Sequence, residues 1–337
     1  MLDILKRKQE YISCEWLEYG MHFAVNGLYY CDKYAHHGGN NEPVSSLKND
    51  STYDFKDFSL KRKKDIQKVR KGRILDRCKD CYLLKKSNWC NDNKIKHLAI
   101  STNLSCNSNC IYCFSHLNKK FFNSLKDIPI YYYLKKCIEK KIINSDCEIQ
   151  FGGGEPLLNK EFELIMKLFK NNNFYNISLY SSGIKYSPII EEFLKNDMLK
   201  SIIISPDAGN RDLYKKIKSV DKFESVWQNI KKYAIAQGKN KSQVKVKYII
   251  IPGINDNIKN IEEFIEQAKS CSVNYVLIDV EKEWYKNNYK SEQKVRQLFK
   301  LVRYFEKYTE KSCLNWGHNS SVCCAIEDYH SLYDDTF

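Results

Sequence analysis

Residues 98–114 read LAISTNLSCNSNCIYCF, and this stretch decides how the rest of the chain is interpreted. A short apolar run at its start predicts a strand, and a C-x3-C-x2-C spacing follows at Cys106, Cys110 and Cys113. Three thiolates so close in sequence can bind one face of an iron–sulfur cube. Because the loop supplies no fourth cysteine, one iron of such a cube would stay open to another ligand. A structural zinc site with His116 as its fourth ligand is the alternative that the spacing allows.

Apolar, β-branched runs alternate with stretches of helical periodicity across the middle of the chain. The expected strands lie at residues 95–100, 147–151, 177–180, 201–204, 244–251 and 275–280, and the expected helices at residues 128–142, 161–170, 188–199, 223–237, 258–270 and 290–310. Strands that alternate with helices predict an α/β fold with a parallel sheet and right-handed crossovers. Six such strands fit a partial barrel as well as an open doubly wound sheet. The last 25 or so residues are expected to be irregular.

The cysteine loop resembles that of the radical S-adenosylmethionine (SAM) enzymes, in which an aromatic residue precedes the third cysteine, as Tyr112 does here. The resemblance implies a partial (β/α)6 TIM-like barrel. It also implies that Cys106, Cys110 and Cys113 are the catalytic residues that hold a [4Fe-4S] cluster, whose open iron binds the amino and carboxylate groups of SAM.

Four later segments resemble the SAM-binding turns of the same family. Residues 151–156, FGGGEP, are similar to its GGEP element, where glycines allow a close backbone approach and Glu155 offers an acceptor to the SAM ammonium. The turns that end the next three strands read SSG, SPDAG and KYIIIPGIND, and Ser182 replaces the usual Asn of the first. The resemblance implies that SAM contacts Tyr112, Gly153, Gly154, Glu155, Pro156, Ser181, Ser182, Ser205, Asp207 and Lys247. Lys245 lies on the same strand face and is the alternative to Lys247.

A second set of cysteines precedes the barrel: Cys14, Cys31, Cys78 and Cys81, with Cys90 as an alternative ligand. Asn26-Gly27 predicts a hairpin turn that brings Cys14 and Cys31 together, and a C-x2-C pair is a compact ligand unit. The order resembles the SPASM-type auxiliary module, although that module normally follows the barrel. The resemblance implies a second [4Fe-4S] cluster, and a structural zinc site is the alternative.

The expected organisation is an auxiliary iron–sulfur domain at residues 1–92, the barrel at 93–285 and a tail at 286–337. The first segment shows little long periodicity and few apolar residues, so a metal would have to replace the missing core. The remaining cysteines are either ordinary buried thiols or have no assigned role: Cys137, Cys147 and Cys271 in the first group, and Cys313, Cys323 and Cys324 in the second.

Composition and charge limit the class of protein. The chain has 337 residues, of which 43% are hydrophobic, and this excludes wholesale disorder. Its 55 Lys and Arg against 41 Asp and Glu give a net charge of +14, which permits an acidic partner, although a general lysine-rich bias explains it as well. No apolar stretch reaches the length of about 18 residues that a membrane span needs. An N-terminus without the apolar core of a signal peptide predicts a cytoplasmic protein, in which 14 cysteines favour metal over disulfides.

The expected function is therefore reductive cleavage of SAM to a 5′-deoxyadenosyl radical, which abstracts hydrogen from a substrate. A peptide or protein side chain is the expected substrate, and a sugar, a nucleotide or tRNA, or a small metabolite is the alternative. An electron donor such as flavodoxin or ferredoxin is the expected partner, whereas membranes and nucleic acid are not expected. A non-catalytic zinc or iron–sulfur binding protein is the rival from another class, and it leaves the GGGEP segment without a role.

Overall fold

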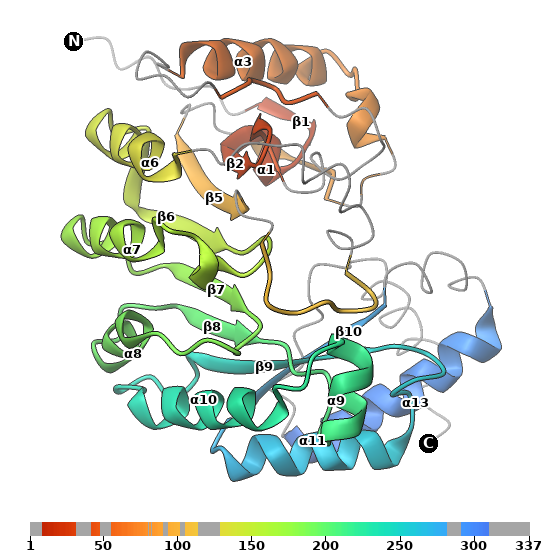
Figure 1. Ribbon diagram of the computed structural model, residues 1–337. Helices are drawn as coiled ribbons and strands as arrows, with labels where there is room; N and C mark the ends of the chain where they lie inside the picture. Colours follow the sequence, from red (N-terminus) through yellow and green to blue (C-terminus); the bar gives the residue numbers. More distant parts are fainter. Residues whose placement is uncertain are drawn as a thin grey trace. The chain divides into compact units, whose positions relative to one another are not determined.

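The computed structural model describes most of the chain (Figure 1). The described residues are 9–31, 42–47, 55–79, 81, 83–89, 94–101, 105–113, 129–281 and 291–309. Cys90, His116, Cys313, Cys323 and Cys324 lie outside them. The chain forms two compact units, the first from residues 1–105 and 120–178 and the second from residues 106–119 and 179–337.

None of the helices in the described part of the chain is long and apolar enough to cross a membrane.

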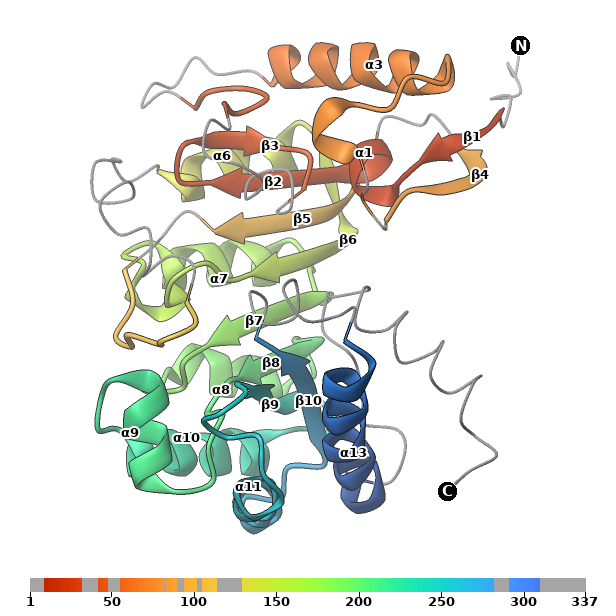
Figure 2. The same cartoon turned by 90° about the vertical axis from the view of Figure 1, so that its right-hand side faces the viewer.

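The first unit is built on strands in the order β3-β2-β5-β6 (Figure 2). These are β2 (Gly20–Ala24), β3 (Gly27–Tyr29), β5 (Ile95–Ser101) and β6 (Ile143–Phe151). β5 pairs in parallel with both β6 and β2, and β2 pairs antiparallel with β3. The expected hairpin is therefore present, but its turn is Val25-Asn26, because Ala24 already pairs with Gly27. The N-terminal hairpin thus continues the sheet to which β5 belongs.

Helices and short strands complete this unit. They are β1 (Gln9–Ser13), α1 (Glu15–Tyr19), α3 (Lys56–Arg70), η1 (Asp76–Cys78), β4 (Lys85–Trp89), α6 (Ile130–Glu139), η2 (Pro156–Leu158) and α7 (Phe162–Asn171). The aromatic ring of Tyr133 on α6 packs on Phe23 of β2, with 6.5 Å between ring centroids. Tyr30, directly after β3, packs on Phe58 of α3 at 5.6 Å. These contacts attach the N-terminal residues to the sheet through an apolar core.

The expectation that residues 1–92 contain little long periodic structure is wrong, because α3 lies within them. It is a 15-residue helix whose buried positions are Phe58, Arg62, Ile66 and Val69. These positions form one helical stripe, and the buried arginine within it conceals the pattern in the sequence. The guanidinium of Arg62 donates to the carbonyl oxygen of Gly20 at 3.3 Å. The division into domains at residues 92 and 285 stays a prediction.

The second unit continues the alternation of strands and helices. Its elements are β7 (Ile177–Ser181), α8 (Pro188–Lys195), β8 (Ser201–Ile204), α9 (Arg211–Lys218), α10 (Phe223–Ala236), β9 (Val244–Ile250), α11 (Ile258–Ser270), β10 (Tyr275–Val280) and α13 (Glu292–Thr309). β9 pairs in parallel with β8 on one side and β10 on the other. All six expected strands are present, and the predicted α/β fold with a parallel sheet is confirmed. α9 was not expected from the sequence.

Burial along β9 alternates with a period of two residues. Val244, Val246, Tyr248 and Ile250 are buried, whereas Lys245, Lys247 and Ile249 are half-buried. The buried face packs on helices, since the Tyr248 ring lies 4.9 Å from Phe264 of α11 and 5.2 Å from Phe305 of α13. The opposite face of β9 therefore carries the two lysines.

The close packing of α11 on the turn after β8 gives a test of this fold. A Cβ atom added at Gly209 would lie 2.1 Å from backbone atoms of Glu263 and Phe264. We expect Gly209→Ala to lower the free energy of unfolding by about 3 kcal/mol, because the backbone of a packed helix must move. Chemical denaturation measures this loss. Gly72→Ala is the control, since a Cβ there meets no atom within 4 Å and adds only the strain of a positive φ, about 1 kcal/mol. Equal effects of the two changes would contradict the packing described.

Candidate cofactor site

The cysteine loop, residues 106–113, is held by the C-terminal end of α9. The backbone N–H of Asn109 donates to the carbonyl oxygen of Lys218 at 2.9 Å, and that of Ile111 donates to Ile217 at 3.0 Å. Carbonyl groups in the last turn of a helix have no partner within the helix. The loop supplies the missing donors, and in return α9 fixes the backbone between the first and third cysteines.

The three thiols of the loop differ in exposure. Cys106 is exposed, whereas Cys110 and Cys113 are partly buried, and the Cys113 N–H donates to the Cys110 carbonyl oxygen at 3.0 Å. Burial raises the pKa of the Cys110 thiol, and the nearby Lys218 ammonium opposes that shift.

The donor set of the loop fits an iron–sulfur cluster. Among the residues that the structure describes, no group of three or more His, Cys, Asp or Glu side chains is arranged to hold a single metal ion. A single tetrahedral zinc needs its ligands to converge, whereas each thiolate of a [4Fe-4S] cluster binds a different iron. Three thiols within eight residues of one loop can each bind a different iron of one cluster.

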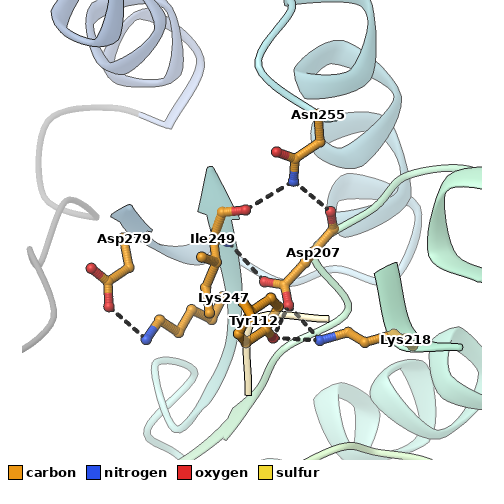
Figure 3. Close-up of polar contacts among 7 residues, drawn as sticks. All are labelled: Tyr112, Asp207, Lys218, Lys247, Ile249, Asn255 and Asp279. Carbon is orange, nitrogen blue, oxygen red and sulfur yellow. Dashed lines mark hydrogen bonds and ion pairs between the residues drawn. The ribbon is translucent and has the colours of Figure 1, made fainter. Parts of the chain in front are cut away.

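A buried polar network lies beneath the loop (Figure 3). Lys218 of α9 and Asp207, just beyond β8, form an ion pair whose side chains are 4% and 0% exposed. The Tyr112 hydroxyl donates to Asp207 Oδ2 and accepts from Lys218 Nζ at 2.8 Å. Asp207 Oδ1 accepts from the N–H of Ile249 on β9 at 2.8 Å. The aromatic residue of the cysteine loop is thereby anchored to two strand ends and one helix.

Asp207 adopts a conformation that its hydrogen bonds must stabilise. Its φ of 58° lies in the left-handed region, which few residue types other than Gly, Asn and Asp tolerate. Burial raises the pKa of the Tyr112 phenol well above its ordinary value, and the Asp207 charge adds to this. Burial lowers the pKa of Lys218, but Asp207 and Cys110 together outweigh burial and raise it. The network therefore holds a charged lysine and a neutral phenol.

Asn255 closes the network from the turn after β9. Its amide nitrogen donates to the carbonyl oxygens of Asp207 at 3.1 Å and Ile249 at 2.8 Å, and its Oδ1 accepts from the Ile251 N–H at 2.6 Å. Asn255 is fully buried. One side chain thus satisfies three backbone groups at the ends of two parallel strands.

Of the other expected SAM-binding residues of this unit, three serines lie at strand ends and Lys247 lies within β9. Ser182, directly after β7, donates to Oδ1 of Asn107 in the cysteine loop at 2.8 Å. Ser181 is buried and accepts from the Gly183 N–H at 3.0 Å, while Ser205 is half-buried directly after β8. The Lys247 ammonium pairs with Asp279 of β10 at 2.8 Å.

The GGGEP segment lies in the first unit, against the end of β5. The Gly152 N–H donates to Ile100 at 2.9 Å, and the Glu155 N–H donates to Ser105 at 2.8 Å. Gly153 has a φ of 99°, which favours glycine. Glu155 is fully buried and accepts from the Leu157 N–H at 3.2 Å, while Pro156 begins η2 and is buried as well.

The expected auxiliary cysteines Cys14, Cys78 and Cys81 are close enough to interact. Cys14 caps α1 and accepts from the Leu17 N–H at 3.3 Å. Burial raises the pKa of Cys14 to about 11 and that of Cys78 to about 12. The charge of neighbouring cysteines, Cys81 among them, contributes to raising both pKa values. The Cys81 N–H donates to the Cys78 carbonyl oxygen at 3.2 Å. Cys31 is half-buried and lies two residues after the end of β3.

Comparison with known proteins identifies the family. Residues 94–268 match the model of the radical SAM superfamily. A GTP 3′,8-cyclase of Clostridium botulinum is 28% identical over 191 residues, which cover 56% of this chain and 57% of the relative. A dual-specificity RNA methyltransferase RlmN of Wigglesworthia glossinidia brevipalpis is 29% identical over 200 residues, which cover 53% and 50% of the two chains. The chain thus spans about half the length of these relatives.

A solved structure shares the fold. Streptococcus suis SuiB bound to SAM superposes with a TM-score of 0.52 at 11% identity, over 84% of this chain and 62% of SuiB. The chain belongs to the radical SAM superfamily and has the partial (β/α)6 TIM-like barrel expected of it. It is accordingly a radical SAM enzyme, and the family implies a [4Fe-4S] cluster and SAM as cofactors.

Two residues of the site were missed from the sequence. Lys218 lies on the unexpected helix α9 in the run KKIK, and one lysine among 55 Lys and Arg gives no signal of burial. Asn107 is a further polar loop residue, and its contact with Ser182 depends on the folded backbone. Asn255 was noted in the PGIND turn, but its bonds to three backbone groups follow only from the structure.

The buried position of Asn255 predicts a large loss of stability when its amide is removed. We expect Asn255→Leu to lower the free energy of unfolding by about 3 kcal/mol or more, because three buried backbone groups lose their partner. Asn257→Ala, two residues away, is the control. Asn257 caps α11 through the N–H of Asn260, and loss of a cap costs about 1 kcal/mol. Thermal unfolding measures both, and an effect of Asn255→Leu no larger than that of the control would rule out the network as described.

Proposed function

We propose that the cysteine loop of this enzyme holds the [4Fe-4S] cluster through Cys106, Cys110 and Cys113 and that SAM binds beside it. When bound, the cluster supplies one electron that cleaves SAM to methionine and a 5′-deoxyadenosyl radical, which takes a hydrogen atom from the substrate to leave 5′-deoxyadenosine and a substrate radical. The attachment of the loop to α9 and to the Asp207 network is the observation that carries this proposal.

The chain's own residues hold the reactants in position. Tyr112 fixes the loop from below, and Ser182 fixes it through Asn107. The backbone at Gly153 and Gly154 and the acidic Glu155 follow β6, which pairs in parallel with β5, the strand that precedes the cysteines. They suit an ammonium group such as that of SAM, because a buried carboxylate is stabilised by a cation. The contacts of Pro156, Ser181, Ser205, Asp207 and Lys247 with SAM stay predictions.

A peptide or protein side chain stays the expected substrate, and a guanosine nucleotide or RNA is the second candidate. The observation that favours the second is that the relatives named above are a GTP cyclase and an RNA methyltransferase. The similarity to these two relatives covers 56% and 53% of this chain, and their names give different substrates, so it identifies the family rather than the substrate. RNA binding that weakens steeply with salt would separate the two. An electron donor such as flavodoxin or ferredoxin is the proposed partner.

Loss of the three loop thiols tests the catalytic cluster. We expect replacement of Cys106, Cys110 and Cys113 by Ala to remove about four irons per chain and to abolish dithionite-dependent formation of 5′-deoxyadenosine. Iron analysis and chromatography of the nucleoside, after anaerobic reconstitution, measure the two effects. Cys137→Ala is the control, because this thiol is buried on α6 and belongs to neither cysteine set. Nucleoside formation by the triple variant would refute the assignment.

We further propose that Cys14, Cys78 and Cys81, with Cys31 or Cys90, hold an auxiliary cluster. The mutual effects of the first three thiols on one another's pKa support this. Replacing Cys14, Cys78 and Cys81 by Ala is expected to remove about four further irons while the loop cluster remains. If the wild-type protein contained zinc and this variant lost it, the result would instead support the structural zinc alternative. Unchanged metal content would contradict both.

A further inference from the structure

Lys218 both binds the backbone of the cysteine loop and places a buried positive charge beside it. Its carbonyl oxygen accepts from Asn109, and its ammonium contacts Tyr112 and Asp207. The same ammonium interacts with the Cys110 sulfur. A side chain only 4% exposed cannot exchange these partners for water.

The charge of Lys218 is poorly screened where it lies. Surface charges are damped by water and salt within about 10 Å, but a buried charge acts through a medium of much lower polarity. Asp207 offsets part of the field. The Lys218 ammonium contacts the hydroxyl of Tyr112, which lies between Cys110 and Cys113 in the sequence, at 2.8 Å. The contribution of Lys218 itself to the field at the cysteine loop is therefore positive.

Reduction of a cluster adds one negative charge. A positive field at a ligand sulfur stabilises the reduced state more than the oxidised state, and charge near a cluster is one of the factors that set its potential. We infer that Lys218 raises the reduction potential of the cluster at Cys106, Cys110 and Cys113, with Asp207 holding the ammonium beside Cys110. This inference rests on the proposed function of the loop.

Asp207 and Tyr112 have distinct parts in this arrangement. Asp207 accepts from Lys218, Tyr112 and the Ile249 N–H, so three donors restrain its carboxylate. Tyr112 donates to Asp207 and accepts from Lys218, which fixes the ammonium relative to the loop backbone. Lys218 is thus a positioning residue that acts on the electron-transfer step through the field it creates.

The test is the reduction potential of the loop cluster in variants of Lys218. The reconstituted protein is titrated with redox dyes as mediators. The signal monitored is the electron paramagnetic resonance signal that changes when SAM is added, so that an auxiliary cluster does not contribute to the measured potential. We expect Lys218→Gln to reduce the equilibrium constant for reduction tenfold or more, which corresponds to about 59 mV for one electron. Lys218→Arg keeps the charge and is expected to stay within threefold of the wild type.

Two further variants separate charge from structure. Lys216→Gln removes an exposed lysine of the same helix and should leave the potential unchanged. Asp207→Asn with Lys218→Gln leaves no unpaired buried charge, and its iron content shows whether the cluster still assembles without the ion pair. A wild-type potential in Lys218→Gln with full iron would overturn the inference, and so would loss of iron from both neutral variants while Lys218→Arg stays loaded. A wild type without iron or 5′-deoxyadenosine would instead refute the proposed function itself.

Discussion

The buried ion pair between Asp207 and Lys218 is the interaction on which the site depends. Moving each of the two charges out of water costs several kcal/mol of free energy. Their mutual attraction offsets this cost only when further hydrogen bonds satisfy the remaining donors and acceptors of the two side chains. Here Tyr112 and the Ile249 N–H supply those bonds, and Asn255 holds the carbonyl oxygen of Asp207. The pair therefore enforces a particular arrangement of two strand ends, one helix and the cysteine loop.

The cysteine loop has no regular structure of its own, so its shape comes from what it contacts. Two of its N–H groups bind the free carbonyl oxygens at the end of α9, and Asn107 accepts from Ser182. Its one large side chain, Tyr112, reaches the ion pair. A thiol set that must bind a cluster is thus positioned by backbone groups and buried polar side chains. This explains why polar residues at strand ends matter as much as the cysteines themselves.

The strands and the cysteine loop could be predicted from the sequence because their signals are local. Apolar runs marked all six barrel strands, and the spacing of Cys106, Cys110 and Cys113 marked the loop. α9 was missed because it has only eight residues, five of them charged. α3 was missed because Arg62 interrupts its apolar stripe. The role of Lys218 could not be predicted, since its burial depends on Asp207, which lies eleven residues earlier in the sequence, before α9 begins, and becomes a partner only through folding.

The Lys247–Asp279 ion pair limits the kind of ligand that Lys247 could bind. Lys247 lies on the half-buried face of β9, opposite to the face that carries the buried Tyr248. Its ammonium is already paired with the Asp279 carboxylate of β10 at 2.8 Å. A carboxylate that bound Lys247 would have to displace Asp279 and leave it unpaired in a partly dry position, which costs free energy. A ligand that offers a cation or a donor to Asp279 as well as an anion to Lys247 avoids that cost. An amino-acid group, with its ammonium and carboxylate on one carbon, has both.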